Sequence, residues 1–139
     1  MLITIEKVLA LKQMPFFKNV SNMALSDLMS VSEEETIKKG TILIDEHEQN
    51  HTIYFVLMGS ALAVSSRTEE KKFFSSQQMI GLDTAFLHAS AGITVKADSQ
   101  MFVLKVSAEK LYRMMSLHPS LGMAILHELS EEIILSRKK

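Results

Sequence analysis

The fold class is decided by one stretch in the middle of the chain, 52-TIYFVLMGSALAVS-65. Its first half, Thr52 to Leu57, is rich in β-branched and aromatic residues, which is typical of a buried strand. Gly59 interrupts this pattern as a turn residue does, and Ala61 to Ser65 then continues as a second strand. The stretch therefore predicts two consecutive short strands joined by a tight turn.

Further short strands are predicted on both sides of this pair. Residues 36–44 have the pattern of one or two strands with a turn at Gly40, and 93–97 and 101–106 close the β region. The polar run 67–72 is interpreted as a solvated hairpin tip, after which Phe73 and Phe74 open the next strand. Many short strands at this spacing predict an antiparallel barrel or sandwich.

Helical periodicity marks the two ends of the chain and one short insertion. At the N-terminal end Pro15 stops a first helix over 1–13, and Ser21 is a good N-cap for a second one. At the C-terminal end a helix from Ser107 breaks at His118-Pro119, and a final helix follows. Residues 81–88, between strands, predict one or two helical turns. The inward stripes are expected at Leu2, Ile5, Val8 and Leu9 of the first helix and at Leu121, Ile125, Leu129 and Ile133 of the last.

The composition is that of one globular domain. The chain has 139 residues, of which 47% are hydrophobic and 22% charged, and its net charge is −1. These values argue against intrinsic disorder and against a strongly basic nucleic-acid module. The absence of cysteine excludes disulfides, Cys-ligated zinc and thiol catalysis. No run of about 20 apolar residues is present, and Glu6 and Lys7 interrupt the apolar N-terminus, so we expect a cytoplasmic protein without membrane insertion.

Together these patterns predict an α+β, mainly β, fold. We expect a double-stranded β-helix or jelly-roll barrel with N-terminal helices, a short inserted helix and C-terminal helices. A single domain over 1–139 is predicted, in which the helices cover 1–34, the barrel covers 35–106 with the inserted helix at about 81–89, and further helices cover 107–139.

Five fragments occur in an order that is typical of one family. They are KQMPFFKNV (12–20), KGTILI (39–44), IYFVLMG (53–59), ITVKA (93–97) and the segment 111–121 around Pro119. In this order and spacing the chain resembles, over nearly its whole length, the cyclic-nucleotide-binding domain of the catabolite-activator and kinase regulatory-subunit type. The first fragment resembles the plug that opens the family's domain, the third its Y-x-(I/V)-x-x-G strand, and the last its hinge region.

This resemblance implies where a ligand binds. In the family the inserted segment is a phosphate-binding cassette, G-E-x-A-L-L-x-x-x-P-R-(A/S)-A-T-V, whose Arg grips the phosphate and whose Glu holds the ribose hydroxyl. Laid without a gap, Leu82 falls on the Glu and Ala91 falls on the Arg. A one-residue slip lets Asp83 replace the Glu. The implied ligand-binding residues are Gly81, Leu82, Asp83, Ala91, Gly92 and Ile93.

Two functions stay open at this stage. The first is a ligand-sensing regulatory domain that binds nucleotides weakly or in an altered way, because Leu82 and Ala91 replace the two binding side chains. Its ligand would be a cyclic nucleotide or another small anion. The alternative is a ligand-independent interaction or dimerisation domain of a larger transcription regulator or transporter. Such a domain would form a homodimer through the C-terminal helix, where Leu126 and Ile134 remain available for a partner.

An enzyme is not expected, because no nucleophile elbow and no Ser/His/Asp order is present. His47 and His51 lie in a loop without the spacing of a metal-dependent barrel enzyme, so no metal site and no catalytic residue is predicted. No helix-turn-helix follows the last helix, and we therefore expect no specific DNA binding by this chain alone.

Overall fold

The computed structural model describes residues 4–86 and 92–138. The chain divides into two compact units. The β unit is Ser32–Ala108, and the helical unit combines Met1–Val31 with Glu109–Lys139. The first carries the strands and one short helix, and the second carries the flanking helices.

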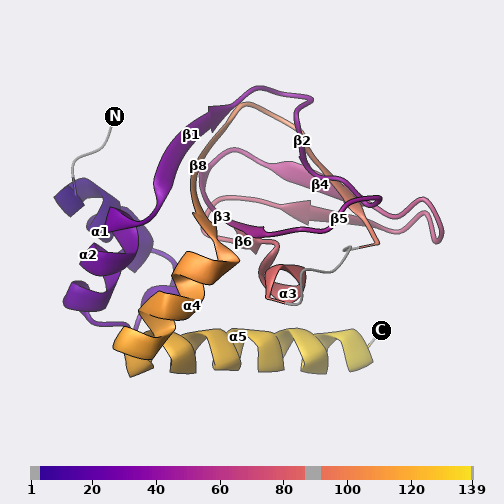
Figure 1. Cartoon of the computed structure of the whole chain (residues 1–139). Coiled ribbons are helices and arrows are strands. Elements are labelled where there is room, and N and C mark those ends of the chain that lie inside the picture. The colour runs from indigo at the N-terminus through magenta and orange to yellow at the C-terminus, as the bar shows by residue number, and fades with distance from the viewer. Residues whose placement is uncertain (1–3, 87–91, 139) are drawn as a thin grey trace. The chain divides into compact units, whose positions relative to one another are not determined.

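The described part of the β unit contains two antiparallel sheets of four strands each (Figure 1). The first sheet has the order β1-β8-β3-β6 and the second has the order β2-β7-β4-β5. Both sheets pair strands that are far apart in sequence, as a jelly roll requires, so the predicted fold class is confirmed. The elements are β1 (Glu33–Ile37), β2 (Ile42–Ile44), β3 (Thr52–Met58), β4 (Ala61–Val64), β5 (Lys71–Phe74), β6 (Met79–Ile80), α3 (Leu82–Ala85), β7 (Thr94–Ala97) and β8 (Met101–Ser107).

The core of the β unit comes from the alternation of side chains along each strand. In β4, Ala61 and Ala63 are buried whereas Leu62 and Val64 are half-buried. In the first sheet, Val56 of β3 lies opposite Val103 of β8, and neither is exposed. Removing these apolar surfaces from water is what holds the two sheets together. The buried cluster consists of Ile37, Ile44, Val56, Ala61, Ala63, Ile80, Val95, Ala97, Met101 and Val103.

The helical unit contains the helices that the sequence predicts. Ser21 caps α2, since its Oγ accepts the Ala24 N–H at 3.1 Å. The last helix begins at Pro119 with His118 as its N-cap, which is also the predicted break. The elements are α1 (Thr4–Lys12), the 3₁₀ turn η1 (Pro15–Phe17), α2 (Asn22–Ser30), α4 (Ala108–Leu117, which starts on the last residue of the β unit) and α5 (Pro119–Arg137).

Two details of the predicted strands are wrong. β5 begins at Lys71, so Phe73 and Phe74 close this strand rather than open it. The reason is that backbone pairing of Val64 with Lys71 extends the β4–β5 ladder regardless of side-chain polarity. The two-residue strand β6 was not predicted either, because a pair of residues is too short to show an alternating pattern.

The predicted apolar stripes of two helices are also partly wrong. Ile5 and Leu9 of α1 are 68% and 60% exposed, and the buried residue of this helix is Leu11. In α5, Leu121 and Ile125 are buried as predicted, whereas Ile133 is 54% exposed. Periodicity shows the direction in which a helix is apolar, but it does not show how far along the helix a packing neighbour extends.

Gly59 offers a test of the β3–β4 turn. It adopts a left-handed conformation with φ of 94°. A Cβ atom at this position would lie 2.4 Å from the carbonyl oxygen of Gln100 and 2.8 Å from Cα of Met101. We therefore expect Gly59→Ala to lower the free energy of unfolding by more than the roughly 1–2 kcal/mol that a left-handed residue costs alone. Urea denaturation measures this loss.

The matched control is Gly40→Ala. Gly40 has nearly the same φ, 91°, but the nearest atom to its Cβ would be Cε of Lys96 at 4.0 Å. Only the conformational cost should appear in this variant. Equal losses in the two variants would contradict the steric explanation of Gly59.

Candidate ligand site

The predicted ligand site begins where β6 runs into α3. Gly81 is the N-cap of α3 and has a φ of 93°. A Cβ here would lie 2.6 Å from the carbonyl oxygen of Thr52 and 2.7 Å from Nδ2 of Asn50. Both the backbone conformation and the available space therefore select glycine. The Gly81 carbonyl accepts the Ala85 N–H at 3.1 Å, which closes the single turn of α3.

The side chain of Asn50 connects this junction to the start of β3. Asn50 is 7% exposed, and its Nδ2 lies 3.0 Å from the Thr52 carbonyl oxygen and 3.3 Å from both the Gly81 carbonyl oxygen and Oγ1 of Thr84. Its Oδ1 accepts the Thr52 N–H at 3.2 Å. One buried amide thus links β3, the end of β6 and α3. Sequence reasoning missed Asn50, because a single Asn in a polar loop has no distinguishing pattern.

The predicted site residues have different environments. Leu82 is 3% exposed and Asp83 is exposed, so the two positions considered for the family's Glu hold a buried apolar side chain and a solvated carboxylate. Gly92 is exposed with a φ of 68°, and Ile93 is half-buried and packs against the inner apolar cluster of the β unit. Ala91 and the neighbouring His88 lie outside the described residues.

One basic residue of the first sheet lies two strand pairings away from this junction. Lys105 of β8 lies opposite Tyr54 of β3, and Tyr54 lies opposite Ile80, the residue before Gly81. Sequence reasoning missed Lys105 because it is distant from the cassette along the chain. Only the antiparallel register shows that two strand pairings separate them.

The charge of Lys105 is already neutralised by neighbouring carboxylates. Its Nζ lies 2.9 Å from Oε2 of Glu35 and 3.8 Å from Oε2 of Glu33. The hydrogen bond to Glu35, together with the charges of both glutamates, raises the pKa of Lys105 above its usual value. Burial, and then the charge of Glu35, raises the pKa of Tyr54. This ammonium is therefore already paired within the first sheet, and an anionic ligand would have to compete with two carboxylates for it.

Lys96 is the other basic residue near the end of the predicted cassette. It lies on the face of the second sheet that points away from the core. Its neighbours in β7, Val95 and Ala97, are buried in the inner cluster, whereas Lys96 is exposed. Alternation along the strand therefore directs Lys96 away from the core.

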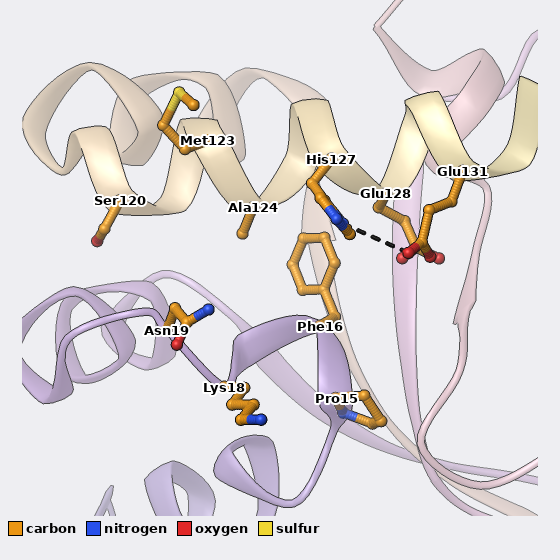
Figure 2. A pocket seen from close by; sticks show the side chains of 10 residues that line it. All are labelled: Pro15, Phe16, Lys18, Asn19, Ser120, Met123, Ala124, His127, Glu128 and Glu131. Carbon is orange, nitrogen blue, oxygen red and sulfur yellow. Dashed lines mark ion pairs between the residues drawn. The ribbon is translucent and has the colours of Figure 1, made fainter.

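The helical unit contains a separate groove, between η1 and α5 (Figure 2). Its volume is about 540 Å³. The ring of Phe16 projects from η1 toward α5, where His127 lies 3.7 Å from a carboxylate oxygen of Glu131 (Figure 2). The other lining residues include Pro15, Lys18, Met123 and Glu128. The groove shows that α5 does not pack closely against η1 along this part of its length.

The described part of the chain holds neither a metal-binding cluster nor a helix that could span a membrane. No group of three or more His, Asp or Glu side chains there is arranged to hold a metal ion. None of the helices in that part is both long enough and apolar enough to cross a membrane.

Comparison with known proteins finds similar solved structures but no match to a family model or a curated protein. No protein-family model and no curated protein matches the chain by sequence. Among solved structures, the sensor domain of the transcriptional regulator DNR from Pseudomonas aeruginosa superposes with a TM-score of 0.75 at 17% identity. The match covers 90% of this chain and 91% of that one.

Two kinase regulatory chains are similar over part of their length. The regulatory domain of Toxoplasma gondii protein kinase A, solved with cAMP, has a TM-score of 0.78 at 16% identity, covering 92% of this chain and 50% of that one. The regulatory subunit of a cAMP-independent protein kinase A from Trypanosoma cruzi, bound to guanosine, has a TM-score of 0.75 at 15% identity, covering 91% and 44%. This chain therefore spans about half the length of either regulatory chain. Its fold is that of the cyclic-nucleotide-binding domains.

Asn50 allows the junction at Gly81 to be tested. Asn50→Ala removes the side chain that bonds Thr52, Gly81 and Thr84, and with it the hydrogen bonds that join these three residues through one buried amide. We expect the free energy of unfolding to fall by about 1–3 kcal/mol. Amide hydrogen exchange over residues 81–85 should accelerate more than that of β8. The control is Gln49→Ala, an exposed neighbour that should change neither quantity. Uniform acceleration throughout the β unit would contradict a local role.

Proposed function

We propose that this chain is a regulatory, ligand-sensing domain in which the segment from Gly81 to Ile93 forms the ligand site. The fold supports this proposal, because the solved structures that share it include a transcriptional sensor domain and a kinase regulatory domain with bound cAMP. The proposed site residues are Gly81, Leu82, Asp83, Ala91, Gly92 and Ile93. The proposed role is that of a non-catalytic cytoplasmic module.

The observation that carries the proposal is the burial of Leu82 at the position of the family's Glu. A leucine that is 3% exposed offers no acceptor to a ribose hydroxyl. Ala91 offers no cation to a phosphate. A hydrogen bond to a charged group contributes roughly 1.5–3 kcal/mol. Losing both contacts costs about 3–6 kcal/mol, which is roughly a hundred-fold to ten-thousand-fold in affinity. The domain therefore binds cyclic nucleotides weakly or binds a different ligand.

The guanosine-bound relative illustrates one form that a different ligand takes. Guanosine has no phosphate, and the protein that carries it is described as cAMP-independent. A site without a fixed cation suits such a ligand better than a cyclic phosphate, because no buried anion then remains uncompensated. A small anion held by backbone N–H groups is the other possibility for this site.

The output of the proposed sensor is a movement of α5 about the hinge at residues 115–119. Within the helical unit, Nε2 of His118 lies 2.7 Å from Oδ2 of Asp27, so a hydrogen bond ties the N-cap of α5 to α2. The groove beside Phe16 gives α5 room to shift against η1. A ligand drives this shift only if it binds more tightly to one position of α5 than to the other.

A titration tests the ligand proposal. The melting temperature of the intact chain is followed with cAMP, cGMP, guanosine and inorganic phosphate, each raised to millimolar concentration. A ligand that binds the native state raises the melting temperature. We expect the cyclic nucleotides to act only in the millimolar range. Saturation by cAMP at micromolar concentration would contradict the loss of affinity, and no response to any of the four would favour the interaction domain.

Restoring the family's side chains tests the assignment of residues within the cassette. Ala91→Arg should tighten cAMP binding about ten-fold or more, since one charge-assisted contact is regained. Leu82→Glu combined with Ala91→Arg should tighten it further. Leu82→Glu alone is the control, because it adds a buried carboxylate without a cation and should only lower stability. If the folded Ala91→Arg protein gains no affinity, the alignment of this position is wrong.

A second function, dimerisation through α5, is favoured by the exposed apolar side chains of that helix. Leu126, Ile133 and Ile134 are 59%, 54% and 50% exposed, and their spacing places them on one stripe. We propose that this stripe pairs with its copy in a homodimer, as a regulatory module of a larger protein would use it. Such a stripe is costly to leave in water, because every exposed apolar side chain forgoes the free energy of burial.

The dimer is tested by sedimentation equilibrium. Replacing Leu126 and Ile134 by Glu should convert a dimer into a monomer, because four carboxylates would then face one another across the interface. Leu135→Glu is the matched control, since Leu135 is equally apolar and 61% exposed but lies on another side of α5. A wild-type chain that stays monomeric at high concentration would exclude this function.

A further inference from the structure

The outer face of the second sheet carries a row of residues that crosses all four strands and is apolar except at Lys96. Ile42 of β2 lies opposite Lys96 of β7, and Lys96 lies opposite Leu62 of β4. Leu62 in turn lies opposite Phe73 of β5. Because the alternate residues of β4 and β7 are buried in the core, this row faces outward.

The size of the side chains on β4 is unusual for an antiparallel sheet with one solvated face. The inward residues are the small Ala61 and Ala63, and the outward residues are the larger Leu62 and Val64. An outward face that only meets water is ordinarily polar. At the two edges of the row, Ile42 and Phe73 are 55% and 60% exposed.

The centre of this face is hollow. Leu62 and Val64 are half-buried and line a hollow of about 450 Å³ together with Lys39, Thr94 and Lys96. The apolar side chains therefore form the recessed floor, and the long lysine side chains rise around it. A convex apolar group fits such a shape, whereas a flat surface does not reach its floor.

The charge around the hollow has one dominant sign. Lys39 and Lys96 line it, and Lys71 lies opposite Val64 at its edge. In the part of the chain that the structure describes, none of these three ammonium groups forms an ion pair. The one acidic side chain in the lining is that of Asp98, which is exposed. The hollow is thus complementary to a ligand that combines apolar and acidic groups.

We propose that this outer face, which we name the lysine-rimmed face and define by Lys39, Ile42, Leu62, Lys71, Phe73 and Lys96, docks an acidic amphipathic segment of a partner protein. Leucine or phenylalanine side chains of the partner fill the hollow over Leu62, and its Asp and Glu side chains pair with the three lysines. The inference goes beyond the ligand site and does not depend on it, because the face lies on the other side of the sheet from the inner core.

Two other classes of partner fit the face less well. A bilayer is flat and would contact the edges of the row but not the recessed floor. A nucleic acid needs more neutralising cations, since each phosphate contact contributes little and affinity rises with their number. Three lysines around an apolar floor match a short acidic and apolar peptide better than a phosphate backbone.

The test is binding of three synthetic peptides of equal length to the isotopically labelled intact chain. The first alternates Asp and Glu with Leu and Phe, the second replaces the acids by Lys, and the third replaces Leu and Phe by Ser. NMR amide shifts report both the affinity and the place of binding. The first peptide should bind below roughly 1 mM and shift residues of β2, β4, β5 and β7. The second and third should bind at least ten-fold more weakly.

Variants assign the binding to this face. Lys39→Glu combined with Lys96→Glu should weaken the acidic peptide at least ten-fold, and Phe73→Ser should weaken it without unfolding, because Phe73 is 60% exposed. The matched control is Arg137→Glu with Lys138→Glu, which makes the same charge change at exposed positions of the last helix and should not alter binding.

Several outcomes would overturn the proposal. The first is that the acidic peptide does not bind up to roughly 1 mM. The second is that the peptide with Lys in place of the acids binds equally well. The third is that the control variant Arg137→Glu with Lys138→Glu weakens binding of the acidic peptide as much as Lys39→Glu with Lys96→Glu does. Tighter binding to phosphatidylserine vesicles than to the peptide would replace the partner by a membrane. A dimer that Lys39→Glu with Lys96→Glu dissociates would replace it by a second copy of this chain.

Discussion

The junction at Gly81 depends on one close approach between backbones. The strand β3 and the start of α3 come so near that the Thr52 carbonyl oxygen occupies the space of a Cβ on Gly81. Asn50 then bonds both sides of this contact with a single buried side chain. Because the amide is buried, its hydrogen bonds do not exchange with water, and losing one costs the full desolvation of its partner. The position of the junction between β6 and α3 is therefore set by its contacts with β3.

A junction held in this way does not depend on a polar side chain at position 82. Leu82 follows Gly81 directly and is buried, so the position that the proposed alignment gives to the family's Glu is part of the apolar packing. The fold tolerates the exchange because an apolar side chain needs no partner, whereas a buried carboxylate does. The positive charge of Lys105 does not replace the missing cation, since Glu35 holds it at 2.9 Å. In the proposed site, the contacts that hold the backbone are thus separate from the side chains that would bind a ligand.

The sequence predicts the strands and their class well because their side chains alternate or form long apolar runs. The fold class, the N-cap at Ser21 and the helix start at Pro119 all follow from local chemistry. The sequence predicts poorly those features of the structure that depend on a residue far away in the chain. The exposure of Ile5 and Ile133 is set by how far the packing partners extend, which periodicity along one helix does not contain.

In the candidate site, too, features set by local chemistry are predictable and features set by distant neighbours are not. Glycine at position 81 and the proposed replacement of the family's Glu by Leu82 come from the sequence, because each follows from comparing one position with a motif. Asn50 and Lys105 are not visible, since their contacts join residues that lie far apart in the chain. The distance of Lys105 from the cassette is two strand pairings, although many residues separate them in sequence.

The two faces of the second sheet are under different constraints, because one packs in the core and the other faces outward. Inward residues such as Ala61 and Ala63 must fit the volume of the core, where adding or removing one methylene group changes the stability of the fold. Outward residues such as Leu62 and Phe73 fill no core volume, so packing within the β unit does not account for their size. Lysines on the outer face also keep the edge strand β5 from pairing with other chains. Protection of the edge alone, however, explains the charge of Lys71 and not the apolar floor beside it, and that floor is what the proposed partner would cover.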